Sequence, residues 1–270
     1  MTTPYAVGIA ASAIARHMAA VLASGIEPGR LAAMGQSILT AGCSARSPLL
    51  GRTVSEAISK EQHQDGGWSD VEESLWCLGY LKSCPGVHRG PIEAGLTWVT
   101  SQRGPEGGLG KTSRDRARIP LTGLACALCP EVVGERDLDW LWRAWEADLN
   151  GPTQLTYKAG FFLLGCAHPL CHAAPGFVLK TINYLRDEQN GGGGFGPWKD
   201  HPCGSDPWST GVVLWGLSCV PTLAPRDVLQ RAVEWLEQDQ LPNGLWPYHP
   251  IDEGSSLALI GLSKALPLLD

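Results

Sequence analysis

The sequence predicts an all-α fold: a single ring of six helical hairpins, an (α/α)6 barrel, that takes up residues 1–270 as one domain. Three observations predict it. A glycine-containing turn recurs with a spacing in the forties, nearly apolar segments alternate with amphipathic ones, and no period-two strand pattern competes with them. A period of that length is typical of repeat architectures, in which each repeat is one supersecondary unit.

The recurring turn is clearest at residues 62–68, Gln-His-Gln-Asp-Gly-Gly-Trp, and similar turns close at Leu109, Phe195 and Trp246. From Trp68 onward the closing residues follow at intervals of 41, 86 and 51. The double interval predicts a degenerate turn near residue 152, and one period before Trp68 predicts another near residue 25. Glycine permits positive φ, Gln can bond free groups at a helix end, and a large apolar side chain fills the gap between hairpins. Six such turns are enough to close a ring.

The outer helix of each hairpin is expected to mix charged residues with an apolar stripe. In the first, residues 5–23, Ala10, Ile14, Met18 and Val21 recur at helical spacing. The second opens with a sequence typical of a capping box, residues 53–56. The expected outer helices start near residues 5, 53, 91, 137, 175 and 225.

The inner helices are expected to be nearly apolar throughout, because other helices surround them. The segment 121–128, Leu-Thr-Gly-Leu-Ala-Cys-Ala-Leu, is the clearest example. The expected inner helices are 30–40, one beginning at 70, 121–128, 153–166, 208–219 and 253–268.

Composition limits the functional classes. The net charge is −6 without a basic block, which disfavours a nucleic-acid partner. The Cys count is nine, an odd number, and most of these residues lie in apolar runs, which indicates free thiols and a cytoplasmic location. The Ala-rich N-terminus is interrupted by Arg16 and His17, so we expect neither a signal peptide nor a membrane span. We expect a small-molecule partner and no cofactor, and the sequence gives no prediction of the oligomeric state.

Three segments carry a resemblance to a known family: residues 62–68, residues 232–246 with Trp235, Gln240 and Trp246, and residues 206–214, which begin Asp-Pro-Trp-Ser-Thr. Over roughly residues 50–270, the chain resembles the α/α-toroid family of squalene–hopene cyclases and protein prenyltransferase β-subunits. The resemblance implies a toroid with cyclase-type activity.

The chain also departs from that family. The Asp-x-Asp-Asp motif that protonates the substrate in triterpene cyclases is absent, and those enzymes use two toroids where one is predicted here. The Asp-x-Cys zinc pair of prenyltransferases has no counterpart either. These departures indicate altered chemistry on a different substrate.

The candidate site follows from the ring itself. Inner-helix N-termini should converge on one mouth, so the residues after each turn share a rim. The longest and most polar turns are 190–206 and 241–255, and extra length in one repeat usually maps to the binding face. The candidate acid–base residues are Asp206, Asp252 and Glu253, with His201 or His249 as partner. The candidate substrate-binding residues are Trp198, Trp208, Tyr248, Asp70, Glu73 and Tyr157. Asp70 and Asp206 are equally well interpreted as helix N-caps.

A Cys/His cluster, Cys166, His168, Cys171 and His172, has a spacing that zinc ligands can adopt, and it is similar to the Cys-His of lanthipeptide cyclases. It falls at the C-terminal end of an inner helix, opposite the expected mouth. We therefore expect no catalytic metal.

The predicted function is a stand-alone terpene-cyclase-like enzyme that catalyses an acid–base cyclisation or rearrangement of a mainly apolar small molecule. Two alternatives remain open: a carbohydrate-active (α/α)6 hydrolase or lyase with a carboxylate pair at the mouth, and a non-catalytic binding or scaffold toroid.

Overall fold

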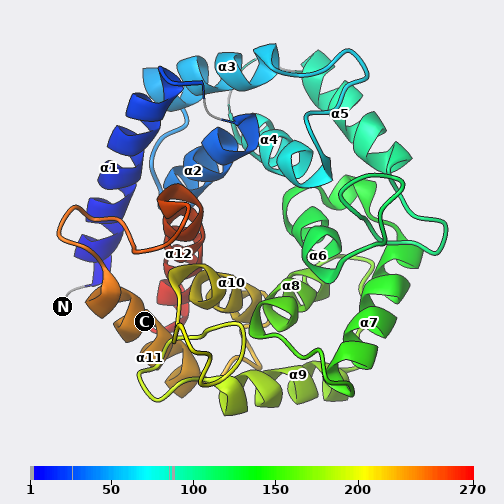
Figure 1. The fold of residues 1–270 in the computed structure, drawn as a ribbon, viewed down its shortest axis with the longest axis vertical. Helices are drawn as coiled ribbons and strands as arrows, with labels where there is room; N and C mark the ends of the chain where they lie inside the picture. The colour runs from blue at the N-terminus through cyan, green and yellow to red at the C-terminus, as the bar shows by residue number, and fades with distance from the viewer. Residues whose placement is uncertain (1–2, 26, 85, 87–88) are drawn as a thin grey trace.

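The recurring turns join outer helices to inner ones in a closed double ring (Figure 1). The computed structural model describes residues 3–25, 27–84, 86 and 89–270. The outer helices are α1 (Thr3–Leu22), α3 (Ser55–Lys60), α5 (Arg89–Ser101), α7 (Glu135–Leu149), α9 (Pro175–Glu188) and α11 (Arg226–Asp239). The inner helices are α2 (Pro28–Thr40), α4 (Val71–Ser83), α6 (Ile119–Leu128), α8 (Thr156–Cys166), α10 (Pro207–Ser218) and α12 (Ile251–Ala265).

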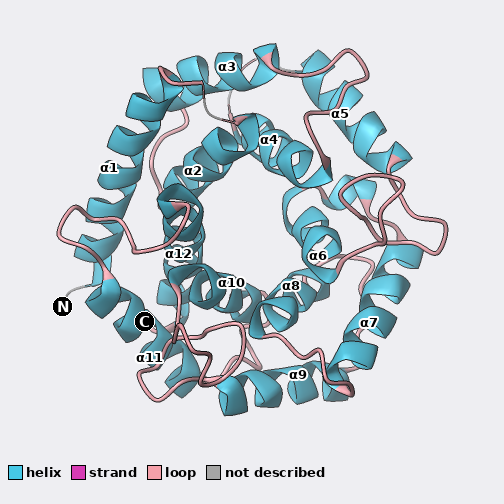
Figure 2. Cartoon of the chain, in the orientation of Figure 1, coloured by secondary structure: helices cyan, strands magenta, loops and turns pink. Residues whose placement is uncertain are grey.

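The described residues contain no strand, and the all-α ring of six hairpins is confirmed (Figure 2). The turn expected near residue 152 lies between α7 and α8. One boundary differs: the second outer element starts earlier than residue 53, because a π-helical stretch, Pro48–Val54, leads into the short α3. Ser47 caps this stretch by accepting a hydrogen bond from the Leu50 N–H at 3.2 Å. Two 3₁₀ turns, Pro130–Val132 and Leu266–Leu268, complete the helical elements.

Each inner helix packs against the two inner helices beside it, in the circular order α2, α4, α6, α8, α10, α12 and back to α2. Glycines allow the close approach in the second half of this order. A Cβ on Gly211 of α10 would lie 2.3 Å from the Leu257 carbonyl oxygen of α12, and one on Gly160 of α8 would lie 2.8 Å from the Val212 carbonyl oxygen of α10. Any side chain there would separate the helices, so these residues narrow the inner ring.

The turn glutamines tie each hairpin to the next. The side-chain amides of Gln62, Gln189 and Gln240 each donate to two carbonyls, one in their own turn and one in the first turn of the following outer helix. The acceptors are Gly66 at 2.6 Å and Pro91 at 2.8 Å, Gly193 at 2.7 Å and Val228 at 3.0 Å, and Gly244 at 3.0 Å and Ala6 at 3.3 Å. The predicted role of Gln at a helix end is thus confirmed in three turns.

The apolar residue that closes each turn is anchored by the next inner helix. The backbone N–H groups of Trp68, Leu109, Phe195 and Trp246 all donate to a buried hydroxyl near the start of that helix. The acceptors are Ser74, Thr122, Thr210 and Ser255, at 3.0, 3.0, 2.9 and 3.0 Å. These four turn residues are at most 3% exposed, so they fill the space between hairpins.

The same contacts close the ring between the last and first hairpins. Gln240 reaches Ala6 of α1, and Arg30 of α2 forms a bidentate ion pair with Asp252 of α12, at 2.6 and 2.8 Å. Within the described part of the chain, one helix is long and apolar enough to cross a membrane: Tyr5–Leu22 of α1, with a mean hydropathy of 1.4 and 33% of its residues buried. In the ring it packs against α2 and α12. The expectation that the chain has no membrane span stays a prediction.

Candidate active site at the mouth of the ring

A cavity of about 490 Å³ opens where the N-termini of α2, α4 and α12 meet. Its volume falls in the range of small-molecule sites. Backbone and side-chain contacts between these termini fix its shape, since Glu73 of α4 accepts a hydrogen bond from the Gly29 N–H at the start of α2. The lining residues are Glu27, Gly29, Arg30, Ala33, Ser69, Asp70, Glu72, Glu73, Trp76, Lys111, Pro250, Asp252 and Glu253.

Trp76 of α4 forms part of this lining and meets Trp215 of α10. The two ring centroids are 6.3 Å apart with an angle of 38° between the planes. The ring neighbours of α4 are α2 and α6, and those of α10 are α8 and α12, so the two indoles come from opposite inner helices. They are 8% and 7% exposed. The pair therefore bridges the interior of the ring, and Trp76 links it to the cavity wall.

The mouth is strongly acidic. The cavity lining contains six carboxylates and two cations, Arg30 and Lys111. Both cations are engaged: Arg30 with Asp252, and Lys111 with Asp70 at 3.2 Å and Glu72 at 3.6 Å. The unbalanced negative charge disfavours an anionic ligand.

Glu72 and Glu253 lie near each other at this mouth, on α4 and α12. Burial raises the pKa of the Glu253 carboxyl, and the negative charge of Glu72 raises it further, whereas a hydrogen bond from the Trp208 side chain lowers it. Burial also raises the pKa of Glu72, against the opposing effect of Lys111, although 41% of its side chain remains exposed. A carboxyl group whose pKa is raised keeps its proton to higher pH, as a general acid requires.

Asp252, a predicted acid–base residue, is 2% exposed, and both its oxygens accept hydrogen bonds from Arg30. That pair joins α12 to α2, so the contacts of Asp252 favour a structural role.

Asp70 and Glu73 also bond to backbone groups. Asp70 caps α4 by accepting from the Glu73 N–H at 2.9 Å, as the capping interpretation expected. Glu73 accepts from the N–H groups of Gly29 and Ser69, each at 3.0 Å. They hold the mouth together, and their predicted contact with substrate stays a prediction.

Asp206 caps α10, accepting from the Ser209 N–H at 2.7 Å and the Ser209 hydroxyl at 2.8 Å. Burial raises its pKa, and the Ser209 hydrogen bonds lower it. Three predicted binding residues do gather around Asp206. Trp208 stands edge-on to Tyr157, with ring centroids 5.3 Å apart. Burial raises the pKa of Tyr248, and the nearby charges of Asp206 and Glu253 raise it further. An aromatic cluster thus flanks Glu253.

The two predicted histidines are not brought together by any contact of the described residues. His201 lies in the 190–206 turn beside Trp198, with ring centroids 4.3 Å apart, and its Nδ1 accepts from the Cys203 N–H. Trp198 is 44% exposed and lines a separate hollow between the 151–155 and 198–199 segments. His249 is exposed. His201 lies near enough to Asp206 for its charge to lower the pKa of that carboxyl, whereas the ionisable neighbour that most affects Glu253 is Glu72. The predicted pairing of a histidine with a carboxylate stays a prediction.

Three lining residues of the site were not singled out from the sequence, namely Arg30, Lys111 and Trp76, and neither was Trp215, which packs against Trp76. Glu72 follows the Trp68 turn and belongs to the predicted rim, but no sequence signal distinguishes it from Glu73. The position of α2, some forty residues earlier in the chain, decides that Glu73 and not Glu72 accepts the hydrogen bond from the Gly29 N–H.

The Cys/His cluster lies at the opposite end of the ring, at the C-terminus of α8, as expected. His168 is 7% exposed, and backbone groups occupy both its ring nitrogens: the Leu170 N–H at 3.2 Å from Nδ1 and the Pro130 carbonyl at 3.1 Å from Nε2. It is therefore committed to shaping the loop. Among the residues that the structure describes, no group of three or more His, Cys, Asp or Glu side chains is placed to hold a metal ion.

The double ring of six helical hairpins is an α/α toroid, and comparisons with known proteins agree on this fold. No protein-family model matches the chain. It is 25% identical over 232 residues to a drimenyl diphosphate synthase from Streptomyces showdoensis, an alignment that covers 74% of this chain and 42% of the relative. The chain thus spans less than half the length of that relative.

Solved structures match more completely. The type II terpene cyclase MstE from Scytonema superposes with a TM-score of 0.75 at 14% identity, covering 98% of this chain and 99% of that one. The ent-copalyl diphosphate synthase from Streptomyces platensis gives 0.67 at 14% identity, covering 88% of this chain and 50% of that one. The chain has the fold of type II terpene cyclases, and the predicted resemblance to the α/α-toroid terpenoid cyclases is confirmed.

Proposed function

We propose that this chain is a terpene-cyclase-like enzyme that catalyses an acid–base cyclisation or rearrangement of a mainly apolar, prenylated small molecule. The observation that carries the proposal is Glu253: a half-buried carboxyl with a raised pKa that lines the mouth cavity beside Trp208 and across from Glu72. We further propose that the 270 residues work as one domain, in the cytoplasm, without a cofactor, a nucleic-acid partner or a membrane span.

Glu253 acts as the proton donor in this proposal. A carboxyl group with a raised pKa is a weak acid, so the best acceptor on the substrate is an oxygen, such as an epoxide or carbonyl, and not an isolated alkene. Transfer of the proton from Glu253 to that oxygen generates positive charge on the adjacent carbon. A neighbouring double bond then attacks that carbon and forms the new carbon–carbon bond.

The walls of the cavity suit a cationic intermediate. Trp76 lines the cavity, and the face of a Trp ring attracts a cation by about 0.5–2 kcal/mol. The surplus carboxylates stabilise positive charge at longer range, and one of them, Glu72, is placed to accept the proton that leaves at the end of the reaction.

The acidic mouth also indicates the head group of the substrate. The relative is named a diphosphate synthase, whereas MstE was solved with geranylgeranyl dihydroxybenzoate as substrate, a name without a diphosphate. Here both cations of the lining are already paired with carboxylates. We therefore propose a neutral or cationic head group, and no diphosphate.

The experiment incubates the purified chain with prenylated aromatic compounds, their terminal epoxides and prenyl diphosphates, and follows products of unchanged mass by chromatography and mass spectrometry. We expect turnover of an epoxide or carbonyl compound and none of the diphosphates. Glu253→Gln, which keeps shape and removes the proton, should reduce turnover about 100-fold or more. Glu27→Gln, at an exposed residue of the same cavity, is the matched control and should reduce turnover by about threefold at most, because water screens its charge.

Other outcomes separate the alternatives. Tight binding without turnover would support the non-catalytic toroid, and cleavage of an oligosaccharide would support the hydrolase or lyase, since Glu72 and Glu253 could serve as its two carboxylates. His201→Ala and His249→Ala should change turnover less than threefold in this proposal. A large loss in either variant would instead support the predicted His–carboxylate pair.

A further inference from the structure

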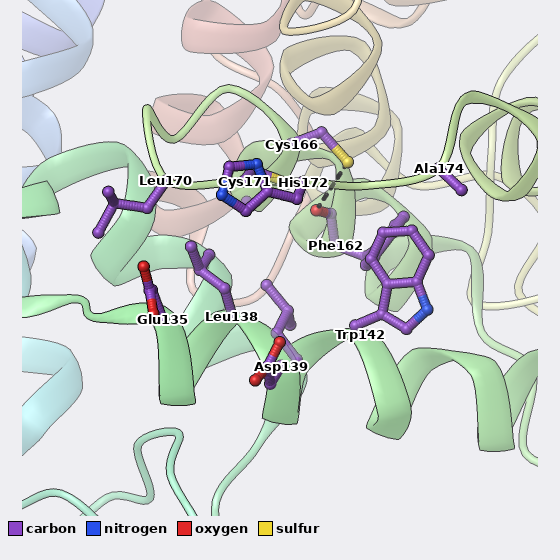
Figure 3. A pocket seen from close by; sticks show the side chains of 12 residues that line it. Glu135, Leu138, Asp139, Trp142, Phe162, Cys166, Leu170, Cys171, His172 and Ala174 are labelled. Atoms are coloured by element: carbon purple, nitrogen blue, oxygen red, sulfur yellow. Dashed lines mark hydrogen bonds between the residues drawn. The ribbon is translucent and has the colours of Figure 1, made fainter.

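A second hollow, of about 420 Å³, lies between α7, α8 and the loop that follows α8, on the side of the molecule away from the mouth (Figure 3). Two thiols line it: Cys166, the last residue of α8, and Cys171 in the loop. The eleven residues of α8 separate it from the mouth by about 15 Å. Its walls are the apolar side chains Leu138, Leu141, Trp142, Phe162 and Leu170.

The two thiols line the same hollow, and each is the largest influence on the pKa of the other. The Cys166 thiol donates to the Phe162 carbonyl at 3.7 Å, and a charged sulfur on Cys171 would be a stronger acceptor than that neutral carbonyl. The Cys166 thiol therefore stabilises the thiolate of Cys171. That contact, together with a backbone N–H from Ala173 and the nearby imidazoles, lowers the pKa of Cys171 to about 6, whereas the pKa of Cys166 is raised.

Ionisable groups approach Cys171 from three helices and from its own loop. The ionisable groups that face it are Cys166 of α8, His168 and His172 of the loop, Cys126 of α6, and Glu135 and Asp139 of α7, which line the same hollow. The Cys126 thiol has a pKa raised to about 12 by burial, so it stays protonated. Both Cys166 and Cys171 are partly exposed, so a small reagent can reach them.

We propose that Cys166 and Cys171 form a redox-reactive thiol pair, in which a hydroperoxide converts the two thiols into a disulfide bond. The Cys171 thiolate attacks one peroxide oxygen, the O–O bond breaks, and hydroxide or alkoxide leaves with the electron pair. Cys171 is then a sulfenic acid. The Cys166 sulfur attacks the Cys171 sulfur, the S–O bond breaks, and water leaves with the Cys166 proton. The peroxide has gained two electrons and the thiol pair has lost two.

This pairing has the features of a peroxide-responsive site: an ionised, accessible thiol beside a resolving thiol. The new bond would join the end of α8 to the loop that enters α9, across the hollow. His168 supports the arrangement, because its two backbone contacts hold the loop in place, and the Cys171 N–H donates to the His168 carbonyl at 2.8 Å.

The first test measures the reactivity of each cysteine with iodoacetamide between pH 5 and 9, by quantitative peptide mass spectrometry. The exposed Cys43 and Cys203 serve as internal references. Near pH 6, Cys171 should react about 10-fold faster than either, since its larger thiolate fraction outweighs the lower nucleophilicity of a more acidic thiol. Equal rates for the three would overturn the proposal.

The second test treats the intact chain with hydrogen peroxide and maps the products. Wild-type protein should lose two hydrogens and yield a peptide with Cys166 linked to Cys171. Cys166→Ser keeps a hydroxyl donor but has no resolving thiol, so Cys171 should stay reactive and stop at a sulfenic acid that dimedone traps. Cys166→Ala removes both and should slow the reaction of Cys171 by about 10-fold at pH 6. Absence of the linked peptide in wild type, or of trapped sulfenic acid in Cys166→Ser, would overturn the proposal.

Discussion

Trp76 and Trp215 approach each other from opposite sides of the inner ring, with their indole centroids 6.3 Å apart. Trp76 also lines the mouth cavity of about 490 Å³. In the proposed function, these two indoles would therefore set the length of hydrocarbon chain that the cavity can hold.

Trp215→Ala should deepen the cavity. Loss of a buried Trp costs about 3–5 kcal/mol of unfolding free energy, and the space left behind should admit a chain one isoprene unit longer. Denaturant unfolding and a series of prenylated compounds of increasing length measure the two effects. Trp145→Ala is the control, because Trp145 is also buried but lies on α7, packs against α8 and α9, and donates from its indole to Thr181. It should lose similar stability without any change in chain-length preference, and a shift in both variants would contradict the assignment.

Arg30→Met should be strongly destabilising, because it leaves the Asp252 carboxylate buried without its partner. A cost of about 3 kcal/mol is expected, since Arg30 is itself 36% exposed and the pair is not fully desolvated. The double variant Arg30→Met with Asp252→Leu should recover part of that loss. Urea unfolding of the wild type, of the Arg30→Met and Asp252→Leu single variants and of the double variant gives the coupling free energy between the two side chains. Additive single effects would show that the two side chains do not stabilise each other.

The proposed role of Glu253 as the proton donor predicts a specific pH dependence of turnover. The pKa of Glu253 is raised by burial and by the charge of Glu72, and only the protonated form donates. Turnover should therefore be lost as pH rises through that raised pKa. Glu72→Gln should lower turnover overall, because Glu72 is the proposed proton acceptor, and it also removes the neighbouring charge, so the falling limb of the remaining activity should move to lower pH. Glu27→Gln should leave the limb in place. A limb that stays fixed in Glu72→Gln would contradict the pairing.

The same raised pKa values act on stability with a definite sign. A folded state that holds protons more tightly than the unfolded state gains stability at low pH and loses it as pH rises through the folded pKa. Relative to Glu72→Gln, the wild-type chain should therefore become less stable as pH increases from 4 to 7. Thermal unfolding across that interval measures the difference, and a difference of the opposite sign would contradict the raised pKa.

Thr210→Val should test the repeated turn. The Thr210 hydroxyl accepts from the buried Phe195 N–H at 2.9 Å, and without it that donor is unsatisfied, at a cost of about 1–3 kcal/mol. Thr210→Ser retains the hydroxyl and should be close to wild type. Thr97→Val, at an exposed position of α5, should change stability by less than about 0.5 kcal/mol. The unfolding midpoints of the three variants measure how much the hydrogen bond between the Phe195 N–H and the Thr210 hydroxyl stabilises the fold. Equal midpoints for Thr210→Val and Thr210→Ser would contradict a stabilising role.

The turns were predictable because their determinants are local. Gly66, for example, has φ of 97°, and a Cβ there would lie 2.6 Å from the Ala94 carbonyl oxygen of the next outer helix, so only glycine fits. The same requirement recurs at Gly107, Gly193 and Gly244, which also have positive φ and lie against the next outer helix, and it leaves a regular spacing in the sequence. From that spacing the order of outer and inner helices follows directly.

The site was less predictable because it depends on pairs that only the closed ring brings together. Arg30 and Asp252 are 222 residues apart, and no pattern along the chain links them. Rim acids such as Glu72 and Glu73 have the same local context, and the position of α2 decides which one caps a helix. The long 190–206 turn also directs Trp198 toward a separate hollow, although its length suggested a binding face.

The bond from Gln240 to Ala6 is the same bond that Gln62 and Gln189 make to the helix after them. The sixth hairpin is thus joined to the first by the same hydrogen bond that joins the other hairpins to their next neighbours along the chain. Open solenoids need terminal capping repeats with a polar outer face and can unravel from either end. A ring joined in this way has neither caps nor a frayed end, because removing any hairpin exposes two apolar neighbours at once. Unfolding should then be all-or-none, and circular permutants opened at different hairpin junctions should melt together as one unit.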